Sequence, residues 1–270
     1  MDKRSQLTRL LLAFVLVSLV PAAGEAGVVW HSALDGDATA LVGADGIATG
    51  TPTATADFYG NLSGAVLFGG QSDQDYYTIT PPTTSLMAGS ISVWIKPLAV
   101  DTTEDGVVAV GASGGGSDVY FSFMNSTNQR WRVDLDDGAS RRDVMSNTTP
   151  DADAWYHMVV TFDSSVSGSN ELRMYIDGVL QTDFQSISGD NDPYNLSHPW
   201  LIGTERTSER YFNGAIDDVR IYDSELSRAE VSALYEAGPL YDAAPIPEPA
   251  SLLLIAMGLL GVARRRRRTA

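Results

Sequence analysis

The sequence predicts an all-β domain over residues 27–240, built as a sandwich of two sheets with one short helix near its C-terminal end. Two observations carry this prediction. Many short runs alternate apolar and polar residues and are separated by glycine-rich turns. One later segment instead shows helix-capping residues and a helical apolar stripe. Many strands at close spacing, with no internal repeat, favour a single sandwich over two domains.

Two strands stand out. In residues 90–97 the alternation places Ile91, Val93 and Ile95 on one face, and residues 155–163 form a long run rich in β-prone side chains. Asp177-Gly178 separates two further runs, 172–176 and 179–182, which favours a tight hairpin because its turn residues adopt positive φ. Shorter runs predict strands at 28–33, 65–68, 76–80, 107–110, 119–124, 131–135, 201–203 and 215–222.

The helix is predicted to begin at Ser227, which forms a capping box with Glu230. Val231, Leu234 and Tyr235 then form one apolar stripe, and Gly238 is a typical residue just beyond a helix end. We expect this helix to plug the sandwich or to cover an edge of it.

The first 26 residues predict a secretory signal peptide. Three basic residues precede an uncharged, mostly apolar run over 10–20, and the small residues Ala22, Ala23, Gly24 and Ala26 follow. The run is too short for a permanent membrane anchor, which needs about 20 apolar residues. The signal is therefore expected to be cleaved off.

Residues 241–270 form a second terminal signal. A proline-rich linker leads to an apolar segment over 250–263 and then to an arginine cluster over 264–268. A helix of this length spans about 21 Å, less than a hydrocarbon core of about 30 Å. We expect transient insertion into the inner membrane, with the arginines on the cytoplasmic side.

Charge and composition exclude several functions. The whole chain has a net charge of −16, and without the eight basic and three acidic residues of segments 1–26 and 243–270, 10 basic and 31 acidic residues leave a charge near −21. Such a surface repels nucleic acid. The absence of cysteine excludes disulfides, a thiol nucleophile and thiolate metal sites, and the three histidines offer little material for a histidine-rich metal site.

The tail closely resembles the PEP-CTERM sorting signal of Gram-negative bacteria. Pro247-Glu248-Pro249 precedes the apolar segment and the arginine cluster in the family's order, at the C-terminus. The resemblance implies that an exosortase recognises this motif and removes the tail. It also implies an exported protein that is first held in the membrane and then lies at the cell surface or outside the cell.

The domain resembles the LamG-like, concanavalin A-like jelly rolls of the laminin G domain 3 type. The matching segments are 90–97, 155–163, 172–180 and, most specifically, 212–222 with Leu226-Ser227. Many members of this group hold one Ca²⁺ on the rim of the sandwich, and the resemblance nominates Asp35 and Asp217 as ligands, with Asp218 in place of Asp217 as the fallback. The family's Asn/Gly-rich loop is replaced here by 41–46. The alternative is that these aspartates only shape turns.

Catalysis is not expected. The Glu-x-Asp-x-x-Glu spacing of β-glucan hydrolases on this fold and the sialidase boxes are absent. A Gly-x-Ser-x-Gly spacing occurs at 111–115, but a predicted strand follows it rather than the helix that a nucleophile elbow needs. His157 lies in a family strand and is expected to be a structural histidine at the rim.

Binding is the favoured function, with an extracellular polysaccharide or surface glycan as the partner. Trp30, Trp131, Trp200, Tyr120 and Tyr194 are aromatic candidates for stacking on sugar rings, although some of them could belong to the core, as Trp94 and Trp155 are expected to. A structural or adhesive envelope protein that binds other proteins is the alternative, and a glycoside hydrolase on the same fold is the third possibility.

Overall fold

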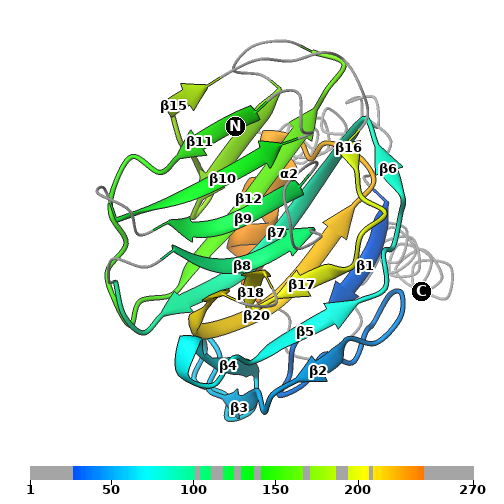
Figure 1. Ribbon diagram of the computed structural model, residues 1–270. Helices are drawn as coiled ribbons and strands as arrows, with labels where there is room; N and C mark the ends of the chain where they lie inside the picture. The colour runs from blue at the N-terminus through cyan, green and yellow to red at the C-terminus, as the bar shows by residue number, and fades with distance from the viewer. Residues whose placement is uncertain are drawn as a thin grey trace, which may run out of the picture.

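The computed structural model describes residues 27–100, 104–110, 118–124, 129–136, 141–166, 171–186, 194–206 and 209–239. Two large sheets lie face to face, with the second sheet in front in Figure 1. The predicted two-sheet jelly-roll sandwich with one short helix is therefore confirmed.

The first sheet, sheet A, has eight strands. In spatial order they are β14 (Val179–Leu180), β13 (Leu172–Ile176), β12 (Tyr156–Asp163), β7 (Ala88–Pro97), β20 (Asn213–Tyr222), β4 (Ala65–Gly69) and β3 (Thr53–Thr55), with β1 (Val28–Ser32) also paired to β20. β7 and β20 are the longest strands and form the centre of the sheet. The strands predicted at 90–97 and 155–163 are thus adjacent partners, β7 and β12.

The second sheet, sheet B, has ten strands. Its main path is β15 (Asp183–Ser186), β11 (Arg141–Met145), β10 (Arg130–Asp136), β9 (Asp118–Met124), β8 (Glu104–Val110), β17 (Trp200–Ile202), β5 (Tyr76–Ile79) and β2 (Ile47–Thr49). The small strands β18 (Thr204–Arg206) and β19 (Glu209–Tyr211) join through β8, and β6 (Ser85–Leu86) pairs with β16 (Tyr194–Asn195) separately. A 3₁₀ turn, η1 (Gly70–Ser72), follows β4.

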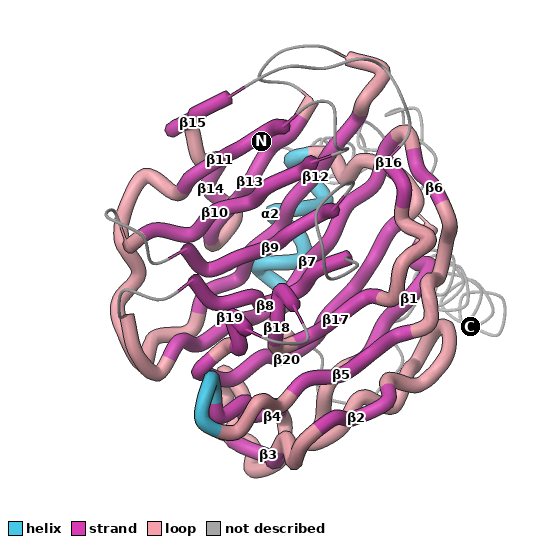
Figure 2. Tube along the Cα trace, viewed as in Figure 1, coloured by secondary structure: helices cyan, strands magenta, loops and turns pink. Residues whose placement is uncertain are grey.

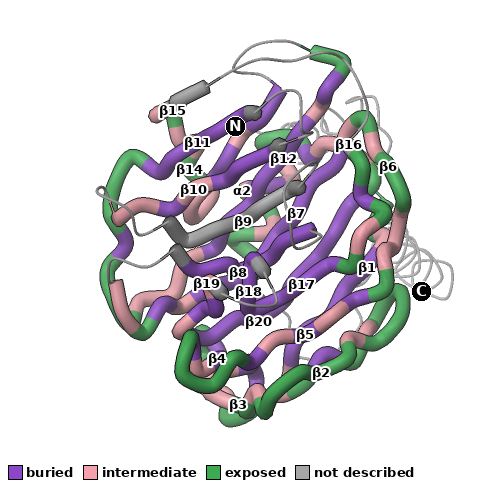
Figure 3. The backbone as a smooth tube through the Cα atoms, viewed as in Figure 1, coloured by how far each residue is buried: buried purple, intermediate pink, exposed green. Residues whose placement is uncertain are grey.

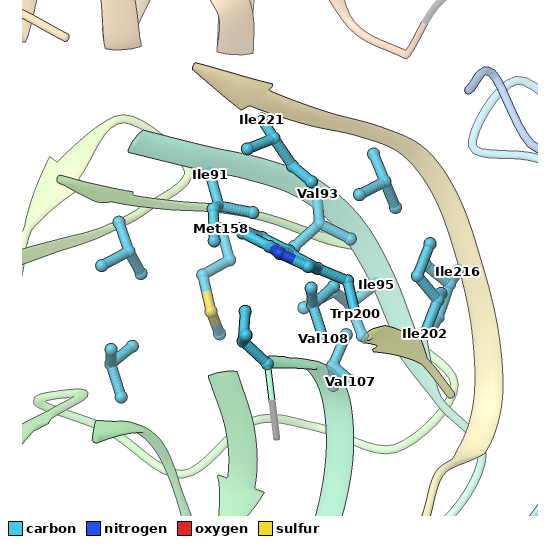
Figure 4. Packing of buried hydrophobic residues seen from close by; sticks show 14 of the residues in the cluster. Ile91, Val93, Ile95, Val107, Val108, Met158, Trp200, Ile202, Ile216 and Ile221 are labelled. Carbon is cyan, nitrogen blue, oxygen red and sulfur yellow. The ribbon is translucent and has the colours of Figure 1, made fainter. Parts of the chain in front are cut away.

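The hydrophobic core fills the space between the sheets. Ile91, Val93 and Ile95 of β7 all point into it, as their alternation predicts. Figure 4 shows the Trp200 ring of sheet B lying among these side chains and Met158 of sheet A. Figure 3 shows the same distribution along the backbone, with buried residues concentrated in the central strands and exposed ones in the loops.

The helix α2 (Arg228–Ala237) begins and ends at the predicted caps. Both capping-box hydrogen bonds between Ser227 and Glu230 are present, and Gly238 follows the last turn with φ 75°. The helix lies behind sheet A in Figure 2 and covers the outer face of that sheet. It neither plugs the end of the sandwich nor covers a sheet edge, the two roles expected from the sequence. Its buried Val231 joins a second apolar cluster with Val159, Tyr175, Tyr222 and Leu226. Sheet A is therefore buried on both faces.

The Asp177-Gly178 hairpin is also confirmed. Ile176 pairs directly with Val179, and the two turn residues have φ of 50° and 74°. Eight short strands were not predicted from the sequence, because these runs are strands only through their neighbours; they are β2, β3, β6, β11, β15, β16, β18 and β19.

One core expectation is wrong. Trp155 is only half-buried, because it precedes β12 and lies beneath the Lys96 ammonium, 5.7 Å from its ring centroid, rather than between the sheets. Trp94 is buried, but on the outer side of sheet A, where β7 alternates away from the core.

Within the described ranges, which leave out 1–26 and 240–270, no helix has the length and apolar character to cross a membrane. The predicted signal peptide and the apolar segment 250–263 lie outside those ranges.

Candidate functional site

A bulge in β20 positions the two adjacent aspartates of the late strand. Asp217 pairs with Trp94 of β7, whereas Arg220 pairs with Ser92, so β20 contains one extra residue at this point. Asp218 has φ 45°, and its backbone N–H donates to the Ala33 carbonyl oxygen at 3.1 Å. The extra residue allows both carboxylates to stay out of the core.

Asp218 is fully engaged in a buried ion-pair network. Its carboxylate accepts two hydrogen bonds from Arg220, at 2.9 and 2.7 Å, and lies 2.8 Å from His31 Nε2. Burial acts to raise the pKa of Asp218, but the Arg220 charge and these hydrogen bonds outweigh it and hold that pKa below its usual value. With its oxygens occupied in this way, Asp218 is poorly suited to the metal-ligand role considered for it as the fallback.

Asp217 is the opposite case. Its side chain is completely buried, and neither carboxylate oxygen forms a hydrogen bond to the described residues. Burial raises its pKa to about 9, and the nearby charges of Asp218, Asp57 and Asp35 contribute to the rise. The backbone N–H of Asp218 opposes this shift without forming a regular hydrogen bond. A protein rarely retains a buried carboxyl without partners, so this one marks a candidate site.

Asp35 and Asp57 approach Asp217 from two separate loops. Asp35 follows β1, in a turn that includes Gly36 at φ 83°. Asp57 lies between β3 and β4, and its carboxylate accepts hydrogen bonds from the backbone N–H and the side-chain amide of Asn61, at 2.8 and 2.7 Å. A Cβ on Gly64 would stand 2.6 Å from Asp57 Oδ2, so a glycine is required there. The fold thus brings the two predicted ligands, Asp35 and Asp217, into one electrostatic cluster.

Sequence reasoning missed Asp57. Its surroundings, Asp-Phe-Tyr-Gly-Asn, indicate only a turn, and nothing in the spacing connects it to a strand residue 160 positions later.

The carboxylates around Asp217 suit a hard cation such as Ca²⁺ only in part. Across the described portion of the chain, no three Asp, Glu or His side chains are grouped closely enough to form a metal site. The chemistry still fits calcium at Asp217, because Ca²⁺ takes backbone carbonyl and water oxygens as well as carboxylates. A cation bound there would satisfy the two buried oxygens that the described residues leave unpaired.

His157 lies in register with this site, on a row of three neighbouring strands. It pairs with Trp94, and Trp94 pairs with Asp217. His157 Nε2 is 2.8 Å from Ser92 Oγ, and its ring lies against those of Trp94 and Tyr235, with centroids 5.0 and 6.1 Å away. Burial lowers its pKa to about 4. His157 is therefore a neutral packing residue beneath α2 and not an accessible one at the rim.

The outer face of sheet B carries a charged array. Trp131, Val133 and Leu135 of β10 point into the core, so Arg132 and Asp134 point outward. Arg132 donates to both carboxylate oxygens of Asp143 on β11, at 2.7 and 2.5 Å, and its Nη2 is 3.5 Å from Asp134. Figure 1 shows α2 on the far side of the molecule from this face. Charged, hydrogen-bonding side chains thus occupy the sheet face that the helix does not cover.

The aromatic candidates divide differently from the sequence expectation. Trp30, Trp131 and Trp200 are each 1 % exposed and belong to the core, so none presents a ring face to solvent. The side chains of Tyr120 and Tyr194 lie outside the described part of the structure. Among the described residues, the exposed rings are instead Phe58 and Tyr59, in the loop that carries Asp57, and Tyr235 of α2.

A two-sheet jelly roll with one sheet covered by a helix defines a lectin-like β-sandwich. The chain belongs to the concanavalin A-like lectin/glucanases superfamily, whose laminin G domain 3 model matches residues 68–232. Residues 245–268 match the PEP-CTERM protein-sorting motif. That segment contains Pro247, Glu248 and Pro249 and lies outside the described residues.

Solved structures share the fold at low sequence identity. Domain 4 of AbnA, an extracellular arabinanase from Geobacillus stearothermophilus, solved with arabinotriose, aligns with a TM-score of 0.60 and 20% identity, covering 77% of this chain and 98% of that one. The ligand-binding domain of botulinum neurotoxin serotype D, solved with N-acetylneuraminic acid, gives 0.55 and 16%, covering 73% and 47%.

One curated relative is a much larger protein. The adhesion G-protein coupled receptor V1 of Danio rerio is 27% identical over 186 residues, which are 63% of this chain and 3% of the receptor. The chain therefore spans only a small part of that relative.

Proposed function

We propose that the protein is an exported, non-catalytic module that binds extracellular polysaccharide or surface glycan. The family, the sorting motif and two structural neighbours solved with sugars support this proposal. The observation that carries it is the charged array on the outer face of sheet B. Because α2 closes the outer face of sheet A, sheet B presents the remaining broad face.

The array suits a ligand rich in hydroxyl groups. The Arg132 and Asp143 side chains are about nine-tenths buried, so their fork-shaped pair is held in place before any ligand arrives. A small number of fixed polar groups on a rigid surface is typical of specific ligand sites. A sugar hydroxyl can both donate to a carboxylate and accept from the guanidinium.

Glycan binding can be tested with a matched pair of arginine variants. Arg132→Gln removes the guanidinium of the array. Arg173→Gln instead removes an arginine of strand β13 in sheet A, which forms an ion pair with Glu225. On a glycan array and with the producer's own exopolysaccharide, we expect Arg132→Gln to lose at least tenfold in affinity and Arg173→Gln to match the unchanged protein. Binding that free sugar does not displace would favour the adhesive, protein-binding alternative. No binding to any glycan would contradict the proposal.

We further propose that Ca²⁺ binds at Asp217, near Asp35 and Asp57. The support is the pair of buried carboxylate oxygens that no described residue hydrogen-bonds, which a cation would compensate. A ligand that binds only the native state stabilises it by about 2.7 kcal/mol at one hundred times its dissociation constant. We expect CaCl₂ to raise the melting temperature by about 5–10 °C over EDTA, given the size of the domain.

Two aspartate variants make the calcium test specific. Asp217→Asn should abolish the calcium-dependent shift, whereas Asp37→Asn, which changes an exposed turn aspartate bonded to the Thr39 backbone, should keep it. A melting temperature that chelator does not change in the unaltered protein would overturn the site.

Export and tail removal complete the proposal. The PEP-CTERM motif implies processing by an exosortase, with a precursor held in the inner membrane until cleavage. We expect Glu248→Ala to leave uncleaved precursor in the membrane fraction, detectable by its size on a blot. Normal processing of this variant would show that the motif is not the signal used.

A further inference from the structure

Five exposed apolar side chains gather around the point where the domain ends, and we call them the exit patch. Its members and their exposed fractions are Phe58 46%, Tyr59 55%, Leu62 84%, Val179 61% and Tyr235 38%. Single exposed apolar residues are ordinary on a protein surface, but a contiguous group of them marks an interaction site.

Ring contacts connect the three elements that carry these residues. The Phe58 ring lies 5.2 Å from that of Tyr59 and 4.8 Å from that of Trp94, and Trp94 stacks on Tyr235 at 6.0 Å. The Tyr235 ring lies 3.5 Å from where a Cβ of Gly178, the neighbour of Val179, would stand. Loop 56–64, the last turn of α2 and the β13–β14 turn therefore contribute to one surface.

The chain leaves the domain beside this patch. Tyr59 Oη donates to the carbonyl oxygen of Ala237, the last residue of α2, at 3.1 Å. A Cβ on Gly238 would stand 1.8 Å from Tyr59 Oη, so the departing backbone runs directly against the ring. After Pro239, the ten residues 240–249 lead to the apolar segment that begins at Ala250. Fully extended, they span at most about 35 Å.

The local charge also sets this surface apart from the rest of the domain. Loop 56–64 has one charged residue, Asp57, and it is buried. Asp177 in the β13–β14 turn and Glu236 at the end of α2 border the patch. A domain with a charge near −21 is repelled by an anionic membrane over most of its surface, but this repulsion is weakest where exposed charges are few.

We propose that the exit patch rests on the lipid–water interface of the membrane while the uncleaved tail holds the precursor there. The short tether keeps the patch at high effective concentration near the bilayer. Aromatic rings with a polar end, such as Tyr59 and Tyr235, are suited to the interface, and Leu62 adds an apolar contact. This inference rests on the proposed membrane insertion of 250–263 and is independent of glycan binding.

The test uses the full-length chain in vesicles of phosphatidylethanolamine and phosphatidylglycerol. Because the chain has no cysteine, Leu62→Cys gives one labelling position for a polarity-sensitive fluorophore. Ile47→Cys is the matched control, since Ile47 is 69% exposed on β2, in the other sheet. Each labelled protein is placed in vesicles with and without brominated acyl chains, and vesicle flotation measures membrane insertion.

We expect the Leu62 label to emit at shorter wavelength and to lose at least half of its fluorescence to brominated lipid, while the Ile47 label keeps the emission it has in water. Equal behaviour of the two labels in protein that floats overturns the proposal and leaves tail insertion standing. A wavelength shift without quenching indicates a protein contact at the patch and also overturns it. Protein that does not float overturns tail insertion and this inference together, without bearing on glycan binding.

Discussion

Two buried titratable side chains on one row of sheet A have their pKa values displaced in opposite directions. His157 and Asp217 both pair with Trp94, on either side of it. Burial disfavours the charged form of each, so it lowers the pKa of His157 to about 4 and raises that of Asp217 to about 9. At neutral pH both side chains are therefore uncharged in the metal-free protein, which is what a packed sheet face beneath a helix requires.

His157 should make the domain sensitive to acid. The folded-state pKa lies below the unfolded value of about 6.5, so the unfolded chain binds more protons between pH 4 and 6.5 and stability falls as the pH drops through this window. We expect acidification from pH 7 to pH 4.5 to cost the unaltered protein about 2–3 kcal/mol more than the His157→Gln variant. Urea unfolding at the two pH values measures this. Parallel losses in both proteins would contradict it.

Asp217 should act in the opposite direction when calcium is absent. Its folded-state pKa lies above the unfolded value, so the stability it contributes is complete below about pH 4 and is lost as the pH rises towards 9. In EDTA at pH 8, we expect Asp217→Asn to be more stable than the unaltered protein by about 1–4 kcal/mol. With calcium this order should reverse. Chemical unfolding in the two buffers gives the comparison, and a variant less stable in EDTA would refute the explanation.

At the scale of elements, two local devices build the candidate site and its surroundings. The bulge in β20 separates the roles of neighbouring aspartates, so that Asp218 joins an ion-pair network while Asp217 has no hydrogen-bond partner among the described residues. The helix α2 covers the outer face of the same sheet, and its last turn carries Tyr235 against Trp94. The helix therefore separates the His157 row from water.

The N-cap of α2 should contribute measurably to stability. Ser227 Oγ accepts from the Glu230 backbone N–H at 3.3 Å, and the Glu230 side chain accepts from the Ser227 backbone N–H at 2.7 Å. Removing such a cap costs about 1 kcal/mol. We expect that loss for Ser227→Ala by denaturant unfolding. Ser232→Ala, inside the same helix, should be neutral or slightly stabilising. Equal effects of the two changes would show that the cap is unimportant.

The whole molecule concentrates like charge on a small domain. With 10 basic and 31 acidic residues between residues 27 and 242, the folded state carries substantial self-repulsion. Some acidic residues pair with basic ones, as in the Lys96–Asp153 ion pair at 3.3 Å, but the basic residues are too few to neutralise the negative charge. The acidity thus favours solubility at a cost in stability.

Salt should therefore stabilise the domain. Raising NaCl from 0.02 to 0.5 M in EDTA reduces the Debye length from about 20 Å to about 4 Å, which screens the repulsion. We expect a rise in melting temperature of a few degrees, since about 1 kcal/mol corresponds to about 2–4 °C for a domain of this size. Scanning calorimetry across a salt series measures it. A fall in melting temperature would show that attractive ion pairs dominate instead.

The sequence by itself determined the sandwich, the hairpin and both ends of the helix. Each depends on neighbours along the chain: alternation in Ile91, Val93 and Ile95, positive φ at Asp177-Gly178, and the capping box from Ser227 to Glu230. Family resemblance added Asp35 and Asp217 as candidate calcium ligands, and in the fold the charge of Asp35 contributes to the raised pKa of Asp217.

Only the tertiary structure decided which face the helix covers, that Asp57 joins the cluster, and that Asp218 is already engaged. It also showed that Trp30, Trp131 and Trp200 belong to the core. The exposed rings of Phe58 and Tyr59 lie beside the end of α2, where the chain leaves the domain. Each of these depends on contacts between residues far apart in sequence, such as the long-range pairing of β1, β4 and β7 with β20. Local patterns specify strands and caps, but burial and the electrostatic environment arise only when distant strands meet.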